Sequence, residues 1–368
     1  VSDASRAVNV TASLLAEEQQ YQAYAKEIRD EYALIRNRVE ARREKRAFLA
    51  LSDAQANAAL LDWSSYEPPV PPNLGVHTVT PSLAELVPYI DWTPFFMTWE
   101  LAGRYPAILE DEVVGEAATQ LFADAQSRLQ WLIEDGRLAA AGVYGFWPAN
   151  KSGSDDISLF TDETRTQALA HLHHLRQQAP KPDDLSPNYC LADFVAPTGI
   201  ADYIGGFAVT AGKNIDSILA EFDDDDYTQI MIKALADRLA EAFAEYLHAQ
   251  VRQQYWGYAE DENLDAEALI KERYQGIRPA PGYPACPEHS EKDTLFRLLD
   301  ATARTDIALT ESYAMTPAAA VSGWYFSHPE SRYFGVGKID EDQLQSYAER
   351  KQVSVEEARR LLTPNLVS

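Results

Sequence analysis

From Ile277 to His289 the chain reads IRPAPGYPACPEH. The four prolines of this segment remove four backbone N–H donors and fix φ, while Gly282 is free to take a positive φ. We therefore predict a stiff, extended loop, because the segment can form neither a helix nor a central strand. It presents one guanidinium, one phenol and one thiol. A loop of this kind is either a surface connector or the wall of a binding site, and the segment alone leaves both open.

The composition describes an ordered, acidic protein. Of its 368 residues, 46% are hydrophobic, enough to bury a full core in two domains or in one large domain with an appendage. The formal charge of −25 argues against a nucleic-acid or anionic-membrane partner, because phosphates are repelled at long range. No apolar run reaches the length of about 18 residues that predicts a membrane span. The two cysteines, Cys190 and Cys286, form no paired framework, which suits a reducing cytoplasm.

The first 75 residues differ in pattern from the rest. The chain has no initiator Met, and Val1–Val8 read as a strand end followed by a capped helix start, so we expect a fragment of a longer polypeptide. Apolar side chains at spacings of three and four predict one long helix over residues 15–48. Its basic end, Arg42–Arg46, is interpreted as a solvated helix and not as a nucleic-acid arm, because acidic residues are interleaved. A polyproline-type spacer at residues 66–73 places a boundary between residues 50 and 75.

After residue 75, strand and helix patterns alternate without a βαβ rhythm, which predicts an α+β fold with a mainly antiparallel sheet. The expected strands cover residues 76–79, 142–147, 157–160, 191–195, 322–326 and 333–338. The expected helices cover residues 82–89, 111–135, 163–178, 217–222, 227–253, 340–350 and 355–361. Residues 203–209 fit either a strand or the buried start of a helix. Gly153 marks the turn of an expected hairpin.

Three motifs with possible chemistry have plainer explanations. Asp223–Asp226 lacks the alternating ligands of a calcium loop and is interpreted as an acidic cluster at a helix N-terminus. His171–His174 lacks the further ligands that zinc needs, so we expect a helix face that ends at Arg176. Gly205–Gly212 is not a GxGxxG loop, which argues against a Rossmann nucleotide site. GxSxG, HExxH and Walker A sequences do not occur.

Two carboxylates stand in informative surroundings. Asp91 lies among the aromatic residues of segment 89–96, where it either caps a short turn or offers its charge to a cation in an aromatic cavity. The residues alone favour neither of these two interpretations. Glu241 lies at the border of the apolar stripe of helix 227–253, where a carboxylate is costly to bury. Oppositely charged side chains three and four residues apart on the same helix, Glu245 among them, ordinarily only stabilise the helix.

Three segments carry a resemblance to a known family. They are Ile90–Phe96, Arg278–Pro287 and Ser322–Pro329, which read IDWTPFF, RPAPGYPACP and SGWYFSHP. Together they resemble signature segments of the C-terminal activation domain of cobalamin-dependent methionine synthase. Supporting agreement occurs at Leu109–Gly115, Tyr189–Phe194 and Ala234–Phe243.

The match runs in order from residue 76 to residue 367. It implies a C-shaped single domain, residues 76–368, around a twisted, mainly antiparallel sheet with flanking helices. Residues 1–15 resemble the end of the family's cobalamin-binding domain. Residues 16–75 resemble its helical, Pro-rich linker.

The resemblance also implies a ligand and a reaction. In this family an electron from flavodoxin, or from a flavodoxin-like reductase, is coupled to methyl transfer from S-adenosylmethionine to inactive cob(II)alamin. Methylcob(III)alamin and S-adenosylhomocysteine result. Because cobalt is the nucleophile, the resemblance implies no catalytic acid or base in this chain, and no turnover by this chain alone. Cobalamin belongs to a neighbouring domain of the full-length enzyme, and zinc belongs to domains that this chain lacks.

The resemblance assigns ligand contacts to nine residues. Arg278 is expected to hold the methionyl carboxylate, which a planar guanidinium can bind through two hydrogen bonds. Asp91 would pair with the α-ammonium or offset the sulfonium charge, and Glu241 would be a second acid near the ligand. The remaining contacts fall on the loop and on an aromatic pair: Ala280, Gly282, Tyr283, Ala285, Tyr333 and Phe334. Tyr283 would face the corrin, and Phe334 stands where the family often has a second Tyr, so stacking is expected there without a hydroxyl contact.

The implied partners are the cobalamin-binding domain of the same chain and flavodoxin or a similar reductase, for a monomeric cytoplasmic protein. Flavodoxins are acidic, as this chain is, so docking would need a local basic patch. The helix end at Arg36–Arg46 is the best candidate for that patch. A different functional class is also compatible with these residues, namely a non-catalytic module that caps a cobalamin domain and senses S-adenosylmethionine.

Overall fold

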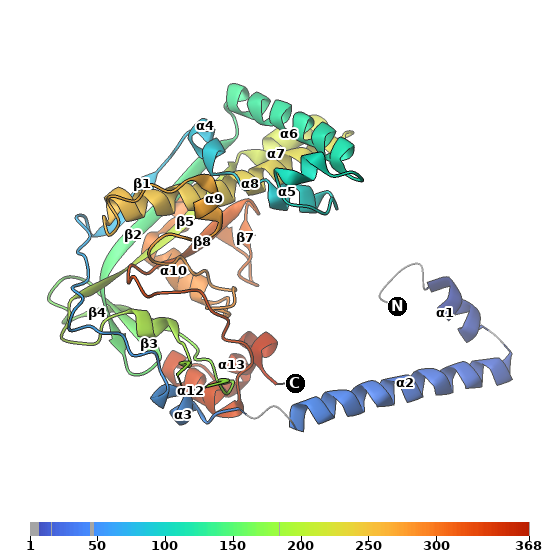
Figure 1. Ribbon diagram of the computed structural model, residues 1–368, viewed down its shortest axis with the longest axis horizontal. Helices are drawn as coiled ribbons and strands as arrows, with labels where there is room; N and C mark the ends of the chain where they lie inside the picture. The colour runs from blue at the N-terminus through green and yellow to red at the C-terminus, as the bar shows by residue number, and fades with distance from the viewer. Residues whose placement is uncertain (1–6, 16, 45–47, 184, 368) are drawn as a thin grey trace.

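Two long adjacent strands, β2 (Ala139–Ser152) and β5 (Asp202–Lys213), form the middle of the main sheet. The computed structural model describes residues 7–15, 17–44, 48–183 and 185–367. The other strands of this sheet are β1 (Gly75–Val79) and β3 (Asp156–Phe160), which both pair with β2, then β4 (Ala168–His173) beside β3 and β8 (Ala320–Tyr325) beside β5. All of these pairs are antiparallel, which confirms the predicted α+β class (Figure 1). A separate two-stranded ribbon joins β6 (Ala308–Leu309) and β7 (Met315–Thr316).

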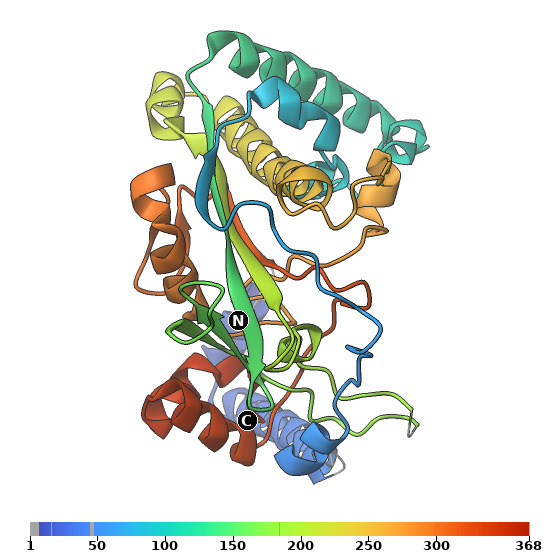
Figure 2. The same ribbon diagram turned by 90° about the vertical axis from the view of Figure 1, so that its left-hand side faces the viewer.

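Both faces of β2 and β5 are buried, which explains why these strands carry apolar and small residues without alternation. On one face, Tyr144 and Phe207 share a core with Phe243 of α8 (Asp226–Gln250). On the other face, Val143 and Ala208 share a second core with α10 (Glu291–Leu299) and α11 (Ala301–Thr305). Figure 2 shows the sheet nearly edge-on between these two layers.

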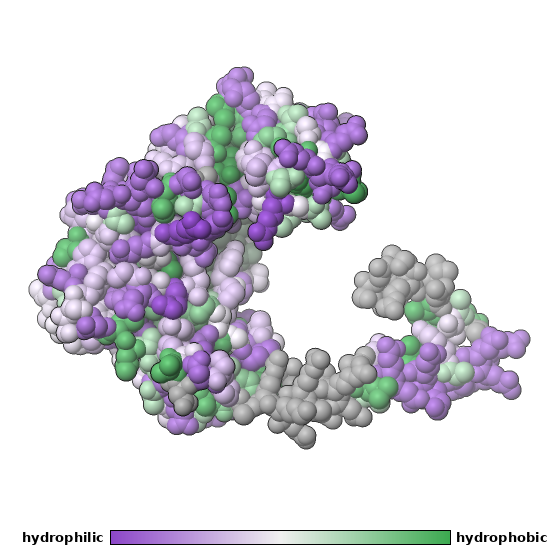
Figure 3. Space-filling view, in the orientation of Figure 1, coloured by the Kyte–Doolittle hydropathy of each residue, from purple (hydrophilic) through white to green (hydrophobic). Residues whose placement is uncertain are grey.

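The remaining helices of the body gather at the two ends of the sheet. Around α8 lie α4 (Leu83–Leu86), α5 (Thr93–Thr98), α6 (Gly115–Asp135), α7 (Ile215–Leu219) and α9 (Ala266–Ile270). At the opposite end lie α3 (Leu51–Ala56), α12 (Glu341–Lys351) and α13 (Val355–Leu361). The body therefore curves into the expected C shape, and Figure 3 shows its hollow side. None of the described helices is long and apolar enough to cross a bilayer.

Two predicted helix starts are confirmed by their capping contacts. The Ser82 side chain accepts from Glu85 N, and the Glu85 carboxylate accepts from Ser82 N, which forms a capping box at α4. Asp225 accepts a hydrogen bond from Thr228 N at 3.0 Å and so caps α8. The acidic run Asp223–Asp226 is thus a helix N-terminus, and the described residues contain no group of metal-ligating side chains.

Three predicted elements are wrong. Residues 163–178 do not form a helix, because residues 168–173 pair with β3 as the edge strand β4, with Ala170 and Leu172 facing the core. Residues 191–194 form a buried 3-10 turn and not a strand, a distinction that a short apolar run cannot reveal. Residues 333–338 are extended without a ladder. They lie against the proline-rich loop, which has few N–H groups to donate.

The N-terminal part forms α1 (Ala7–Leu14), which follows the helix start expected within Val1–Val8, and α2 (Glu18–Glu44), which confirms the long helix predicted over residues 15–48 with shorter bounds. The expected element start at Val1–Val8 lies largely outside the described residues, as does the basic end of α2. After α2, the chain packs on the body. Leu49 N donates to Gln178 O, the Trp63 and Tyr66 rings contact His328, and Trp256 Nε1 donates to Pro69 O. The division at residues 15 and 75 stays a prediction.

Candidate functional site

The proline-rich loop lies along the open edge of β8. Ile277 and Phe326 exchange two backbone hydrogen bonds of 3.0 Å, and Trp324 N donates to Pro279 O at 2.9 Å. Gly323 permits this close approach, because a Cβ there would lie 2.9 Å from Pro279 O. The pairing does not continue toward the start of β8, since Pro279 and Pro281 have no N–H to donate. The loop therefore begins as an added strand and then leaves the sheet.

A tight turn follows at Gly282. This residue has φ of +96°, and its N–H donates to Cys286 O at 2.7 Å, while Cys286 N donates to Tyr283 O at 3.0 Å. A Cβ at Gly282 would collide with the His289 ring. The turn projects Tyr283, which is 62% exposed, and leaves Pro284 O to accept from Val336 N at 2.8 Å. That last bond holds the segment around Tyr333 beside the loop.

Two adjoining cavities open along this loop. The larger has a volume of about 660 Å³ and the smaller about 390 Å³, the size range of sites for small organic ligands. They share Glu241, Glu272 and Arg278. Of the nine sequence-predicted residues, eight line one or both cavities: Asp91, Glu241, Arg278, Ala280, Tyr283, Ala285, Tyr333 and Phe334. Gly282 lines neither cavity, and its observed role is to make the turn.

Arg278 occupies the junction of the two cavities. Its Nη2 donates to Glu245 Oε2 at 2.6 Å, and the two side chains are 20% and 13% exposed. Arg278 Nε and Glu245 Oε1 are buried without a hydrogen-bond partner among the described residues. Burial disfavours the charged guanidinium, but Glu245 and neighbouring tyrosines raise the pKa of Arg278 above its ordinary value. The arginine stays charged and keeps a donor available.

Carboxylates dominate the smaller cavity. Its charged lining consists of Asp91, Glu241, Glu245, Glu272, Arg238 and Arg278. Burial raises the pKa of Glu272 above its ordinary value. The positive charge of Arg278 acts in the opposite direction, and the negative charge of Glu245 adds to the rise. Asp91 caps the turn as one interpretation of the sequence expected, because its Oδ1 accepts from Thr93 N at 2.9 Å; the residue also lines the cavity, and its contact with a cation stays a prediction. An excess of negative charge in a partly enclosed site favours a cationic ligand.

The larger cavity is bounded by aromatic rings and by loop backbone. The Tyr333 hydroxyl accepts from Arg278 N at 3.0 Å and lies 3.3 Å from the Tyr274 hydroxyl, and burial raises the pKa of Tyr333. Phe334 lines the cavity and packs on Tyr189, with ring centroids 5.6 Å apart. Within the described part of the chain, the N–H groups of Ala280 and Ala285 have no acceptor. This end can therefore stack on a flat ligand and donate to it.

The sequence missed several lining residues. Glu245 follows Glu241 by one helical turn on α8, and that spacing could have placed both carboxylates on one face. Glu272, Lys292 and Ser322 come from a short irregular segment, from α10 and from β8. No local pattern predicts that these three elements meet.

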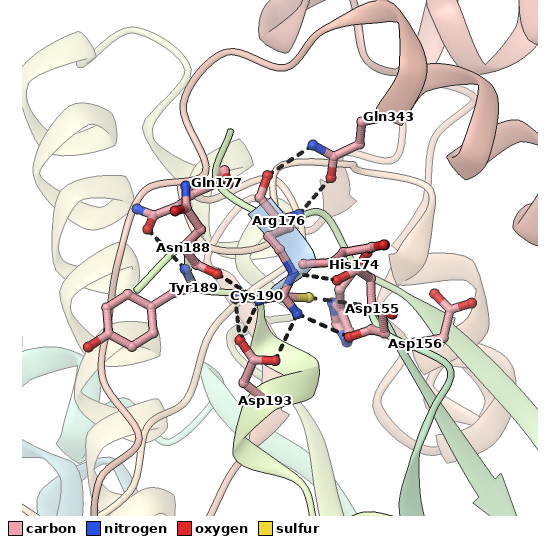
Figure 4. Close-up of polar contacts among 12 residues, drawn as sticks. Asp155, Asp156, His174, Arg176, Gln177, Asn188, Tyr189, Cys190, Asp193 and Gln343 are labelled. Carbon is pink, nitrogen blue, oxygen red and sulfur yellow. Dashed lines mark hydrogen bonds and ion pairs between the residues drawn. The ribbon is translucent and has the colours of Figure 1, made fainter. Parts of the chain in front are cut away.

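A different arginine, Arg176, is fully buried among α12, the turn between β2 and β3, and the turn at residues 191–194 (Figure 4). All five of its N–H donors are bonded: Nε to Asp155, Nη1 and Nη2 to the two oxygens of Asp193, and the remaining two to the carbonyls of Asn188 and Ser154. Gln343 of α12 closes the network through two bonds to the Arg176 backbone. The sequence interpretation of this arginine as the end of a helix face is wrong, because it follows an edge strand and is fully buried.

Comparison with known proteins gives two matches. Residues 82–352 match a family model described as "Vitamin B12 dependent methionine synthase, activation domain". A solved structure described as the crystal structure of the MetH reactivation domain bound to AdoHcy is 57% identical, with a TM-score of 0.84. That similarity covers 87% of this chain and 98% of the other.

Proposed function

The chain belongs to the activation-domain family of vitamin B12-dependent methionine synthase, a methyltransferase, and we propose that its two cavities bind S-adenosylmethionine for reductive methylation of cobalamin. The relative with 57% identity is bound to AdoHcy, the product that methyl transfer from S-adenosylmethionine leaves. The observation that carries the proposal is the shared position of Arg278 between an acidic cavity and an aromatic one.

The two cavities match the two halves of the ligand. The amino-acid half carries a carboxylate, an ammonium and the sulfonium, which suit Arg278 and the carboxylates of the smaller cavity. The adenosyl half is flat and rich in hydrogen-bond acceptors. It suits the free N–H groups of Ala280 and Ala285 and the rings of Tyr333 and Phe334. The rigid loop presents these groups at low entropic cost.

The residues of this chain bind and orient the methyl donor and exclude water from it. Cobalamin on a neighbouring domain would supply the cobalt nucleophile. Methyl transfer disperses the sulfonium charge, so a site with little bulk water favours the transition state over the ground state. The exposed Tyr283 and Ile270, at 62% and 53%, fit a flat apolar macrocycle against the mouth of the cavities. No side chain is needed as an acid or base.

Further partners follow from the same proposal. We place the cobalamin-binding domain against the open side of the cavities and expect the electron from flavodoxin or a flavodoxin-like reductase. The two free, buried thiols, Cys190 and Cys286, suit a reducing cytoplasm. We expect a monomer.

The test is calorimetry with S-adenosylmethionine and S-adenosylhomocysteine. The intact chain should bind both, and Arg278→Ala should weaken binding by roughly 10- to 100-fold, the range for a charge-assisted hydrogen-bonded pair. Arg304→Ala, which removes an exposed arginine of α11 outside both cavities, should bind as the intact chain does. Absence of binding to the intact chain would refute the proposal. Equal binding by Arg278→Ala would refute the role of that arginine.

Methyl donation is separated from ligand sensing by a second measurement. A cobalamin-binding domain added in trans, with a reductant, should form methylcobalamin only when S-adenosylmethionine and this chain are both present. Binding without methylcobalamin formation would leave a capping and sensing role.

A further inference from the structure

We propose that Trp63 and Tyr66 are positioning residues for the ligand site. They clasp the ring of His328, and the turn that begins at His328 leads to Tyr333, which contacts the backbone of Arg278. Neither Trp63 nor Tyr66 lines either of the two cavities. The inference rests on the proposed function above and extends the site to residues that precede the family-model match, which begins at residue 82.

The two aromatic residues belong to the segment 57–74, which joins α3 to β1 along the outside of the body (Figure 2). We call this segment the strap. It contains neither a helix nor a strand, so its position depends on contacts with the body. Pro68 and Pro71 are buried, and Pro69 O accepts a hydrogen bond from Trp256 Nε1 at 2.8 Å. The strap is therefore held on the body on both sides of its prolines.

The ring of His328 is the point where the strap grips the body. The ring centroids of Trp63 and Tyr66 lie 4.7 and 4.6 Å from that of His328, both in edge-to-face geometry. His328 is 3% exposed, its Nδ1 accepts from Glu330 N at 3.1 Å, and its carbonyl accepts from Ser331 N at 3.0 Å. The turn at residues 328–331 is thus fixed by its own hydrogen bonds and by the two rings of the strap.

This turn lies between two parts of the ligand site. Just before the turn, Phe326 exchanges two backbone hydrogen bonds with Ile277, at the start of the proline-rich loop. Shortly after the turn, the Tyr333 hydroxyl accepts from Arg278 N at 3.0 Å. A displacement of His328 therefore reaches Tyr333 and Arg278 through a short stretch of chain and its bonded neighbours.

A positioning role and a merely covering role have different consequences. A strap that only covers apolar surface adds stability and leaves ligand affinity unchanged. A strap that positions the turn is coupled to the ligand, because both favour the same arrangement of Tyr333 and Arg278. By linkage, the clasp and the ligand then strengthen each other by the same factor.

The first test is calorimetry with S-adenosylhomocysteine on variants of the whole chain. Tyr66→Ala, which removes half of the clasp, should weaken binding by at least about 5-fold, the lower end of couplings between distinct sites. Tyr66→Phe should bind as the wild type does, because the Tyr66 hydroxyl has no hydrogen-bond partner among the described residues. Asn57→Ala is the matched control. It removes the 2.8 Å hydrogen bond to Asn188 at the far end of the strap, and should lower stability without changing affinity.

The second test needs no variant and stays decisive if Tyr66→Ala does not fold. S-adenosylhomocysteine added to the wild-type chain should slow hydrogen exchange of the strap N–H groups and of Glu330 N–H. The N–H groups of α13 should keep their rates.

Four results would overturn the proposal: wild-type affinity in Tyr66→Ala, an equal loss in Asn57→Ala, an equal loss in Tyr66→Phe, or unchanged exchange in the strap. If the wild-type chain does not bind S-adenosylhomocysteine, the proposed function itself fails, and this result is distinct from the other four.

Discussion

Arg176 and Arg278 are both withdrawn from solvent, but their surroundings differ in kind. Arg176 is 0% exposed, and carboxylate or carbonyl oxygens of the same chain accept from all five of its N–H groups. Arg278 makes one side-chain ion pair, keeps a buried Nε without a partner, and faces two cavities. A fully bonded guanidinium has nothing left to offer a ligand.

The difference gives a way to separate structural from binding arginines in this molecule. Leaving a buried donor unpaired is costly, but Arg252 also keeps a buried Nη1 without a partner among the described residues and lines neither cavity, so the position of Arg278 at the two cavities is what marks it as the binding arginine. The Arg176 network joins the turn between β2 and β3, the turn at residues 191–194 and α12 at one end of the body. The Arg278 site, in contrast, is assembled from a loop, one face of α8 and an extended segment.

The largest expected effect separates the two arginines by stability. Arg176→Ala should lower the free energy of unfolding by about 3–5 kcal/mol, because it leaves Asp155 and Asp193 buried without their counter-charge. Arg278→Ala should lower it by less, about 1–3 kcal/mol, because it leaves one partly buried carboxylate, Glu245, at the border of a cavity. Urea unfolding of the two variants measures both values. Similar losses of unfolding free energy in the two variants would contradict the distinction between a structural Arg176 and a binding Arg278.

The second-largest expected effect is a loss of folding stability at low pH, and it arises at the end of the body that contains Arg176. His174 is 2% exposed and neither ring nitrogen has a partner among the described residues. Burial lowers the pKa of His174 to about 3, although Asp156 nearby acts in the opposite direction. The folded state therefore binds fewer protons than the unfolded state between about pH 6.5 and pH 3. The stability contributed by the neutral ring is complete above pH 6.5 and is lost as the pH falls through this window.

The measurement compares the unfolding free energy at pH 7 and pH 4.5. The wild-type chain should lose roughly 2–3 kcal/mol more than His174→Gln, which cannot titrate. Parallel losses in the two proteins would mean that His174 is charged or solvated in the folded state. Other carboxylates titrate in both proteins, and the difference between them removes that common part.

The smallest effect tests how firmly the binding arginine is held. Gly323→Ala places a Cβ 2.9 Å from Pro279 O, so the loop or the strand must shift by a few tenths of an ångström. We expect a stability loss of about 1–2 kcal/mol and roughly 10-fold weaker S-adenosylmethionine binding, because Arg278 moves with the loop. Gly337→Ala, at a turn with open space but a positive φ, should cost stability without changing binding. Unchanged binding by Gly323→Ala would show that the β8 edge does not position Arg278.

The sequence predicted those parts of the fold that depend on local patterns. The central strand β2, the stripe of α8, the cap at Ser82 and the acidic N-terminus of α8 follow from local patterns and side-chain chemistry, whereas the patterns left residues 203–209, which form part of β5, open between strand and helix. The prolines and Gly282 predicted a stiff loop, and the loop is irregular and tightly turned as expected. Eight of the nine predicted site residues line the two cavities, although their ligand contacts remain predictions.

The errors fall where long-range contacts decide the outcome. Residues 163–178 contain good helix formers, yet pairing of residues 168–173 with β3 makes them a strand. The acceptors of Arg176 are separated from it by 12 to 22 positions along the chain, so no spacing rule gathers them. The helical spacing places Glu245 on the same face of α8 as Glu241, but it does not predict the ion pair of Glu245 with Arg278, which lies 33 positions away in the sequence.

The contact between the loop and β8 has a consequence beyond ligand binding. An uncovered sheet edge is a template for pairing with another chain, and natural proteins cover or interrupt such edges. Ile277 and Pro279 accept the outward N–H groups of Phe326 and Trp324, so no second molecule can add a strand there. Release of the loop would therefore expose a sheet edge that is prone to aggregation. A ligand that holds the loop in place would also reduce self-association of the protein.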